Sequence, residues 1–399
     1  MNWIDVISAG PGEKSLLTEE AKRAIQNADV IFCADRHAGL VPDAGKRRPL
    51  TPFSAALDDL EALLRESRRP AVLVSGDAGL YSLLPTLKKR FGAEKVRVLP
   101  GVSSLQAFCA RLCVPWQETA VLSAHGRSLS PSALCHAVRT HARTLMLLDG
   151  ERDPNWVWNT LRTGGLDDTH LTIGERISYP DERVAAYESR TYDPLSVALI
   201  ENNCPEPGIP PIGLQDDAFI RGKTPMTKRE IRIQVLATLA LPPDAVVWDV
   251  GAGTGSVTVE CARQCPRGRV YAIERDEDAL HLIEENIAHF HLTNTVIIAG
   301  SAPEVLESLP APTHVFLGGT GGKTKEILEK LKGMNAPVRL CATAVTMESA
   351  QEYGTLLQDF DHFSAVQIAV SRIEPVGGYH MFRAQNPVFI FSADMGGKP

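Results

Sequence analysis

Five short apolar runs recur through the second half of the chain, and an amphipathic stretch follows most of them. Apolar residues in EDALHLIEENIAHF, residues 277–290, follow a helical spacing. Buried strands alternating with helices are typical of a doubly wound, parallel α/β sheet. The tail from 363 to 393 is rich in β-branched and aromatic residues around a Gly-Gly turn, which predicts a closing pair of antiparallel strands. The predicted parallel strands are 246–250, 269–273, 295–299, 313–317 and 338–342.

The first half of the chain shows the same α/β pattern. Four predicted strands lead into glycine-containing turns: SAGPGEK, SGDAGLYS, LPGVSS and SAHGRS. Glycines at strand ends are where α/β sheets bind ligands, and they are also an ordinary way to turn the chain. The predicted strands of this half are 3–8, 30–33, 71–75, 95–99, 119–123 and 144–148.

The two halves meet at NCPEPGIPPIG, residues 203–213. Four prolines and two glycines in this stretch exclude a helix and disfavour a strand. We therefore predict one domain at 1–205 and a second at 206–399, each of ordinary size.

Composition narrows the class of protein. The 399 residues are 44% hydrophobic and 22% charged, as in a globular enzyme, and the formal net charge is −7. An acidic surface argues against a nucleic-acid partner. We expect no signal peptide, no membrane span, no metal site and a cytoplasmic location, because the eight cysteines are scattered and no long apolar run occurs.

The stretch VVWDVGAGTGSVTVE, residues 246–260, carries the most specific signal. Its glycines are Gly251, Gly253 and Gly255, so the third glycine of the dinucleotide fingerprint is replaced by Ser256. The spacing after Asp249 resembles the first motif of class I S-adenosylmethionine methyltransferases. Glu274 ends the next strand, where a carboxylate can accept hydrogen bonds from ribose hydroxyls. A Rossmann-like domain with another nucleotide, or with none, is the alternative.

Two further segments concern the substrate. The segment VFLGGTGGK, residues 315–323, offers no aromatic wall and no polar side chain to bind a target amine. Its glycines leave room for a bulky, flat substrate. In KTPMTKREIR, residues 223–232, Thr227 and Glu230 can form a capping box. Lys228 and Arg232 are four residues apart, so either can meet a substrate carboxylate or simply be solvated.

PMTKREIR, DVGAGTGSVTVE, GSAPE (300–304) and LGGTGG together resemble the decarboxylating precorrin methyltransferases of cobalamin biosynthesis. The strand-end turns of the first half resemble the tetrapyrrole methylase family. Within that family, SAHGR (123–127) and GERISYPDERV (174–184) resemble the branch that acts at carbon 5. The resemblance covers nearly the whole chain and implies a tetrapyrrole-methylase-like first domain with two α/β subdomains, followed by a Rossmann-like class I methyltransferase domain.

The resemblance also implies a reaction. Precorrin-6B would be methylated at carbons 5 and 15 and would lose carbon dioxide from the ring C acetate, giving precorrin-8. The second domain would decarboxylate and methylate carbon 15, and the first would methylate carbon 5. Each domain would bind one S-adenosylmethionine and release S-adenosylhomocysteine, and the protein would be a homo-oligomer.

The resemblance carries site residues over to this chain. Gly76-Asp77-Ala78 departs from the Gly-Asp-Pro that is common in the tetrapyrrole methylase family. In the second domain the cofactor would contact Thr227, Gly251, Ala252, Gly253, Thr254, Gly255, Glu274 and Ala302. The macrocycle would face Gly318, Gly319, Thr320, Gly321, Gly322 and Lys323. In the first domain the cofactor would contact Pro11, Gly12, Gly76, Asp77, Ser103 and Ser104.

Positioning of an already nucleophilic ring carbon against the sulfonium methyl can supply much of the rate. Decarboxylation would benefit from a cation or a proton donor. Lys228, Arg232, Lys323 and His380 are candidates, and His125 is a candidate at carbon 5. Three alternatives stay open: a cobalt-containing precorrin, an RNA or protein substrate, and a first domain that binds tetrapyrrole without catalysis.

Overall fold

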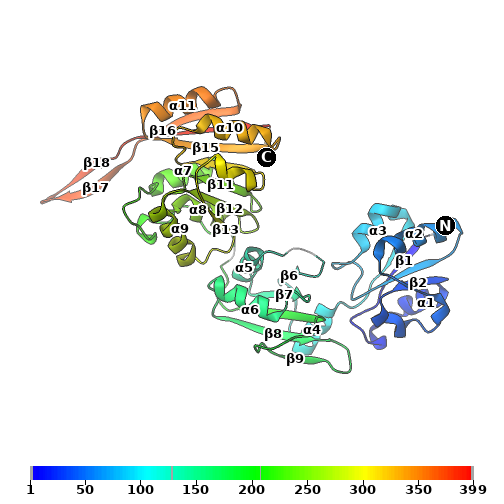
Figure 1. Ribbon diagram of the computed structural model, residues 1–399. Coiled ribbons are helices and arrows are strands. Elements are labelled where there is room, and N and C mark those ends of the chain that lie inside the picture. Colours follow the sequence, from blue (N-terminus) through cyan, green and yellow to red (C-terminus); the bar gives the residue numbers. More distant parts are fainter. Residues whose placement is uncertain (1–2, 127–128, 207, 397–399) are drawn as a thin grey trace. The chain divides into compact units, whose positions relative to one another are not determined.

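The computed structural model describes residues 3–126, 129–206 and 208–396 (Figure 1). These residues form two compact units. The first unit contains the described residues of the ranges 1–129, 137–162 and 166–206. The second contains those of the ranges 130–136, 163–165 and 207–399. In the described part of the chain, no helix is long and apolar enough to cross a membrane.

The first unit begins with a parallel sheet in the order β3-β2-β4-β1-β5. Its interior strand β1 is buried at every residue, as expected for a strand with neighbours on both sides in a parallel sheet. The strands are β1 (Ile4–Ser8), β2 (Val30–Cys33), β3 (Arg47–Pro49), β4 (Pro70–Val74) and β5 (Val96–Leu99). The accompanying helices are α1 (Glu19–Asn27), α2 (Phe53–Arg65) and α3 (Leu84–Phe91).

A second sheet follows, in the order β6-β7-β10-β8-β9. Only the β6–β7 pair is parallel, and the other pairs are antiparallel. Two sheets within the first unit confirm the expectation of two α/β subdomains. The strands are β6 (Ala120–Ser123), β7 (Arg143–Leu147), β8 (Thr169–Glu175), β9 (Arg183–Ala186) and β10 (Ser196–Asn202). The helices of this part of the chain are α4 (Ser104–Leu112), α5 (Pro131–Thr140) and α6 (Pro154–Thr163).

The second unit contains a seven-stranded sheet in the order β13-β12-β11-β14-β15-β19-β16. Its first five strands are parallel, and β19 runs antiparallel to both of its neighbours. The strand order reverses direction beside β11, so the loops after β11 and β14 face each other at the carboxyl edge, where ligands bind in such sheets. The strands are β11 (Val246–Val250), β12 (Arg269–Glu274), β13 (Thr295–Ala299), β14 (His314–Leu317), β15 (Val338–Ala344), β16 (Asp361–Ile368) and β19 (Val388–Met395). The helices are α7 (Arg229–Leu239), α8 (Ser256–Gln264), α9 (Glu277–His289), α10 (Thr324–Gly333) and α11 (Met347–Leu357).

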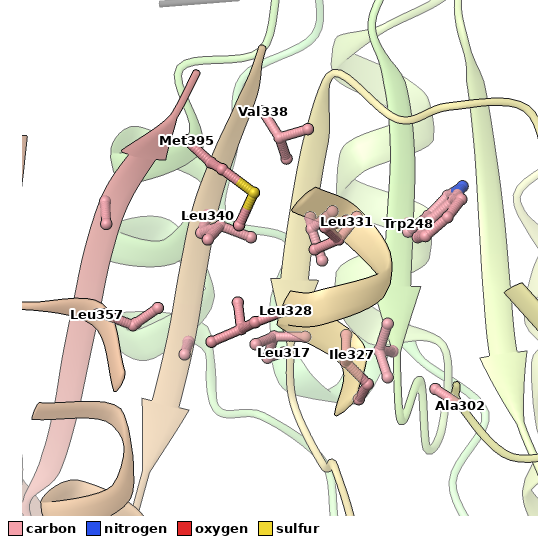
Figure 2. Packing of buried hydrophobic residues seen from close by; sticks show 14 of the residues in the cluster. Trp248, Ala302, Leu317, Ile327, Leu328, Leu331, Val338, Leu340, Leu357 and Met395 are labelled. Carbon is pink, nitrogen blue, oxygen red and sulfur yellow. The ribbon is translucent and has the colours of Figure 1, made fainter. Parts of the chain in front are cut away.

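The core of this unit lies between the sheet and the helices on either face. Helix α10 turns Ile327, Leu328 and Leu331 onto the sheet, where they lie against Leu317 and Leu340 (Figure 2). Positions 327, 328 and 331 share one helix face, so a single amphipathic stripe covers the centre of the sheet.

The tail contains more structure than the predicted pair of strands. Strands β16 and β19 are the predicted antiparallel pair. Between them, β17 (Ser371–Val376) and β18 (Tyr379–Ala384) form a separate hairpin, which extends away from the sheet as a two-stranded ribbon (Figure 1). The Gly-Gly turn lies at the tip of this hairpin.

Arg232 anchors helix α7 from inside the protein. Its side chain is 0% exposed, and its guanidinium pairs with Asp216 at 2.9 Å and with Glu260 at 3.5 Å. It also donates to the carbonyl oxygens of Leu214 and Thr227 and lies over the ring of Phe219. The predicted position of Arg232 at the mouth of a site is therefore wrong, because the buried Glu260 and the mostly buried Asp216 draw the guanidinium inward.

The predicted capping box of α7 is also wrong. The helix begins after Lys228, and the N-cap residue makes no side-chain hydrogen bond. Glu230 cannot reach back to the helix start, because its carboxylate accepts hydrogen bonds from Arg372 at 2.8 and 3.1 Å.

We predict that Arg232→Ala lowers the free energy of unfolding by about 3–5 kcal/mol, because the Glu260 carboxylate is left buried without its cation. Denaturant unfolding measures the change. Lys228→Ala, which removes the same charge one helical turn earlier, should change it by less than about 0.5 kcal/mol. An Arg232→Ala protein of unchanged stability but lost activity would contradict this structural role.

Candidate functional site

In the second unit, the turn after β11 approaches the loop after β14 through bare backbone. Gly251, Gly253 and Gly255 all have positive φ, between +56° and +74°. A Cβ on Gly251 would lie 2.5 Å from the carbonyl oxygen of Gly319, closer than any side chain tolerates. The amides of Gly318 and Gly319 both donate to the carbonyl of Val250, at 2.9 and 3.1 Å. The two predicted loops thus form one glycine-walled edge.

Glu274 fixes the geometry of the same edge from the end of β12. Its carboxylate accepts a hydrogen bond from the Gly253 amide at 2.9 Å. It also accepts from the amides of Arg275 at 2.8 Å and Asp276 at 3.1 Å. The acidic side chain therefore lies directly beside the glycine turn, where the sequence predicts a ribose contact.

The remaining predicted cofactor residues of this unit surround the turn. Thr254 is buried at the start of α8, beside Ala252, and Ala302 lies in the loop after β13. The segment leading to Thr227 passes over Gly253, since a Cβ there would lie 3.4 Å from the carbonyl oxygen of Pro225. Fold topology thus brings these residues to one edge of the sheet.

The four candidate cations of this unit lie at different places in the structure and differ in burial. Lys323 follows the glycine loop and pairs with Glu304. Lys228 is half-buried at the start of α7, whereas Arg232 is fully enclosed by its carboxylates. His380 lies on β18 of the projecting hairpin. A catalytic role for Arg232 is incompatible with its burial, and Lys228 and Lys323 stay candidates for a substrate carboxylate.

Asp249 lies beneath the glycine turn and was not predicted as a site residue. It is completely buried, and among the residues that the structure describes only one of its carboxylate oxygens has a partner, the Thr258 hydroxyl at 2.5 Å. Burial raises the pKa of this carboxyl from its usual 3.8 to about 7, although the Thr258 hydrogen bond opposes the shift.

In the first unit, a cavity of about 670 Å³ gathers the predicted residues. Its wall includes the predicted residues Pro11, Gly76, Asp77, Ser103, Ser104 and His125. Gly12 lies behind the wall, where a Cβ would lie 2.6 Å from the ring of Tyr179, which lines the cavity. Arg127, the last residue of the SAHGR motif, lies outside the described residues.

Asp77 joins two of the glycine turns that form this cavity. Its carboxylate accepts from the Gly79 amide at 2.8 Å and from the Gly101 amide at 2.9 Å. The departure from Gly-Asp-Pro has a local explanation, because the Ala78 amide donates to the Ser8 hydroxyl at 2.8 Å. A proline at this position has no N–H to donate.

The first helical turn of α4 opens on the same cavity. Ser103 caps it, accepting from the Gln106 amide while the Gln106 side chain accepts from the Ser103 amide. Ser104 follows as the first helical residue and lines the cavity. A capped N-terminus carries partial positive charge, which suits a polar or anionic ligand group.

Other lining residues were missed from the sequence. Arg36, His37, Ser75, Arg176 and Tyr179 also form the wall. Arg36, His37 and Ser75 follow the carboxyl ends of β2 and β4, and that position was the only signal that could have identified them. No motif spacing marks them.

Both units fit S-adenosylmethionine on physical grounds. In the second unit the glycine loop after β14 is exposed, and a carboxylate lies beside the glycine turn for ribose hydroxyls. The cavity of the first unit has the volume expected of a small-molecule site, and its wall mixes apolar with polar and charged residues.

Comparisons with known proteins agree with this division of the chain. A family of precorrin methyltransferase domains matches residues 217–395. The tetrapyrrole (corrin/porphyrin) methylases match residues 4–191. Fold and sites therefore define a two-part methyltransferase, with one part from each of these groups.

Relatives of full length identify the family. A precorrin-6Y C(5,15)-methyltransferase (decarboxylating) of Sinorhizobium sp is 29% identical over 97% of this chain and 95% of its own. One of Mycobacterium tuberculosis is 30% identical over 96% of this chain and 98% of its own. A cobalt-precorrin-6B C(15)-methyltransferase (decarboxylating) of Salmonella typhimurium is 36% identical over 45% of this chain and 94% of its own. The chain belongs to the family of decarboxylating precorrin-6Y C(5,15)-methyltransferases, which confirms the resemblance in the motifs.

We predict that stability falls as pH rises from about 4 to about 7, because folded Asp249 keeps a proton that the unfolded chain releases. The slope contributed by this group approaches about 1.4 kcal/mol per pH unit and vanishes above its folded pKa. Denaturant unfolding at several pH values measures it. Asp249→Asn cannot titrate and should remove that part of the slope, so parallel curves for both proteins would contradict the assignment.

Proposed function

We propose that the chain methylates a precorrin twice, at carbons 5 and 15, and removes carbon dioxide from its ring C acetate. Both methyl groups come from S-adenosylmethionine, one bound in each unit. The names of the full-length relatives support the reaction. The observation that carries the two-site form is that each unit has its own glycine-lined, strand-end site with a carboxylate bonded to the loop amides.

We assign decarboxylation and carbon-15 methylation to the second unit and carbon-5 methylation to the first. The Salmonella relative, named for carbon 15 and for decarboxylation, matches only 45% of this chain, which supports the division. The full-length relatives are named without cobalt, which favours a cobalt-free precorrin as the substrate. The proposed partners are thus small molecules, and the net charge of −7 supports the absence of nucleic acid.

The proposed methyl transfer depends more on the position of the ring carbon relative to the sulfonium methyl than on acid–base groups. S-adenosylmethionine supplies an electrophilic methyl group on sulfur. The exposed glycines of the loop after β14, 318–322, let a flat ring lie against backbone, and orientation of this kind is worth about 7–11 kcal/mol in favourable cases. When the C–C bond to the acetate carboxylate breaks, carbon dioxide leaves and the electron pair of that bond enters the conjugated ring. The remaining acetate carbon then takes up a proton. Lys228 and Lys323 are the proposed cations for the carboxylates.

The two sites can be separated in the full-length protein. Gly251→Ala pushes the loops after β11 and β14 apart, and we expect it to abolish decarboxylation and carbon-15 methylation. Asp77→Ala releases two turns of the first cavity, and we expect it to lower carbon-5 methylation alone. Mass spectrometry of products from precorrin-6B and S-adenosylmethionine counts methyl groups and lost carbon dioxide.

Gly333→Ala, at the end of α10 and outside the glycine loops, is the matched control for the first variant, since, apart from its own helix and its chain neighbours, no described atom lies within 4 Å of its Cβ. It should keep decarboxylation and the carbon-15 methyl. If Gly251→Ala loses both methyl groups while Asp77→Ala loses neither, a single site performs the chemistry and the division between the units is wrong.

We further propose that the protein is a homo-oligomer held together through the β17–β18 hairpin. Ile373, Val376, Tyr379, Met381 and Phe382 of this hairpin are between 52% and 79% exposed. These residues lie on both faces of the hairpin, with Ile373 opposite Phe382 and Val376 opposite Tyr379. A lone hairpin is marginally stable in water, and a high density of exposed apolar residues marks an interaction surface. A second copy of the same hairpin offers the matching apolar surface.

We expect the double variant Tyr379→Glu, Phe382→Glu to sediment at a lower mass than the unaltered protein. Analytical ultracentrifugation over a range of concentrations measures this. Trp116→Glu places the same charge at another exposed aromatic residue, 52% exposed and outside the hairpin, and should leave the mass unchanged. An unchanged mass for the double variant would exclude the hairpin as the interface.

A further inference from the structure

Three residues on the wall of the first cavity form a hydrogen-bonded chain that the proposed function does not yet use. Arg36 donates to the Ser75 hydroxyl from Nε at 3.2 Å and from Nη2 at 2.7 Å. The same hydroxyl lies 3.1 Å from Nε2 of His37. All three residues line the cavity, beside Gly76, Asp77 and Ser104.

The direction of these hydrogen bonds follows from the donor count. The Ser75 oxygen accepts twice from a guanidinium, which has no acceptor of its own, so the Ser75 proton points to His37. Nε2 of His37 must then be unprotonated. Burial first, and the Arg36 charge second, lower the pKa of His37 to about 4, so the imidazole is neutral and can accept. His37 is 3% exposed, and its buried Nδ1 has no partner among the described residues.

The hydrogen bonds to Ser75 fix the Arg36 guanidinium at the cavity wall, but they do not neutralise its positive charge. Two of its five N–H groups are used by Ser75, and the others are free to bind a ligand. No Asp or Glu of the described ranges forms an ion pair with it. Arg176, on the same wall, is by contrast paired with Asp181 at 2.7 Å and Asp193 at 3.6 Å.

We propose that Arg36 binds a carboxylate in this cavity, and that Ser75 and His37 are positioning residues that hold its guanidinium in place. The proposal rests on the proposed function of the first unit. A planar guanidinium with free N–H groups is suited to a carboxylate. Two ligands of that reaction carry one: the tetrapyrrole, through its acidic side chains, and S-adenosylmethionine, through its methionine part.

The test uses the full-length protein and follows carbon-5 methylation, with carbon-15 methylation and decarboxylation as internal controls for folding. We expect Arg36→Ala to raise the KM of one ligand about tenfold or more, the loss typical of a charge-assisted hydrogen bond. A higher KM for the tetrapyrrole identifies the substrate carboxylate. A higher KM for S-adenosylmethionine, with weaker binding of S-adenosylhomocysteine, identifies the cofactor carboxylate. Arg68→Ala removes an exposed arginine outside the cavity wall and should change neither KM.

The positioning residues have their own variants. Ser75→Ala should raise the same KM severalfold with little change in kcat, and Ser75→Thr, which keeps the hydroxyl, should restore it. His37→Leu should behave like Ser75→Ala, whereas His37→Gln retains an acceptor near the Nε2 position and should be milder. Changes in kcat and both KM values together, without rescue by threonine, would show a merely structural role and overturn this part.

Unchanged KM values in Arg36→Ala would overturn the whole inference while leaving the proposed function intact. If instead the unaltered protein adds no methyl at carbon 5, the proposed function of this unit fails. Arg36 is then judged by equilibrium titration with the tetrapyrrole and with S-adenosylhomocysteine. Equal affinities in Arg36→Ala and Arg68→Ala for both ligands would overturn the carboxylate site.

Discussion

The second unit depends on a backbone contact between two glycines. Gly251 and Gly319 lie so close that a single Cβ on Gly251 would overlap three backbone atoms of Gly319. Because no side chain separates them, the carbonyl of Val250 can accept from both Gly318 and Gly319. The loops after β11 and β14 are therefore tied into one edge of the sheet, beside the carboxylate at the end of β12.

The two units solve the same problem in a related way. A glycine-rich turn is open to ligands but is entropically costly to order. In both units a carboxylate offsets this cost by accepting hydrogen bonds from backbone amides: Asp77 from Gly79 and Gly101, and Glu274 from Gly253 and its own neighbours. The carboxylates thus hold the loops in position. The surroundings of the two carboxylates differ. Asp77 lies on the wall of a cavity that also contains the hydrogen-bonded residues Arg36, Ser75 and His37, whereas Glu274 lies at the carboxyl edge of a sheet.

Charge inside the second unit serves the fold. Arg232, Asp216 and Glu260 form a largely buried cluster of charges. Arg372, at the start of β17, pairs with Asp216 and also with Glu230 of α7, which extends the cluster. This cluster ties helix α7, the loop around 213–216 and the base of the hairpin together. A buried arginine between two carboxylates is favourable only when all three are present, so the cluster specifies one arrangement of these segments.

The sequence by itself determined the family and most of the buried parallel strands, because such strands are continuous apolar runs and glycine spacings are local. The predicted strands 246–250 and 295–299 match β11 and β13 at both ends, and the other predicted parallel strands agree within about two residues, whereas β3, β8, β9 and β10 were not predicted. The sequence could not give the direction of a charged side chain. Lys228 and Arg232 are four residues apart at the start of α7, yet only the fold supplies the carboxylates that bury Arg232. Only the tertiary structure brings Arg36 and His37 beside Ser75, or separates β17 and β18 from the sheet, because these contacts join residues distant in the chain.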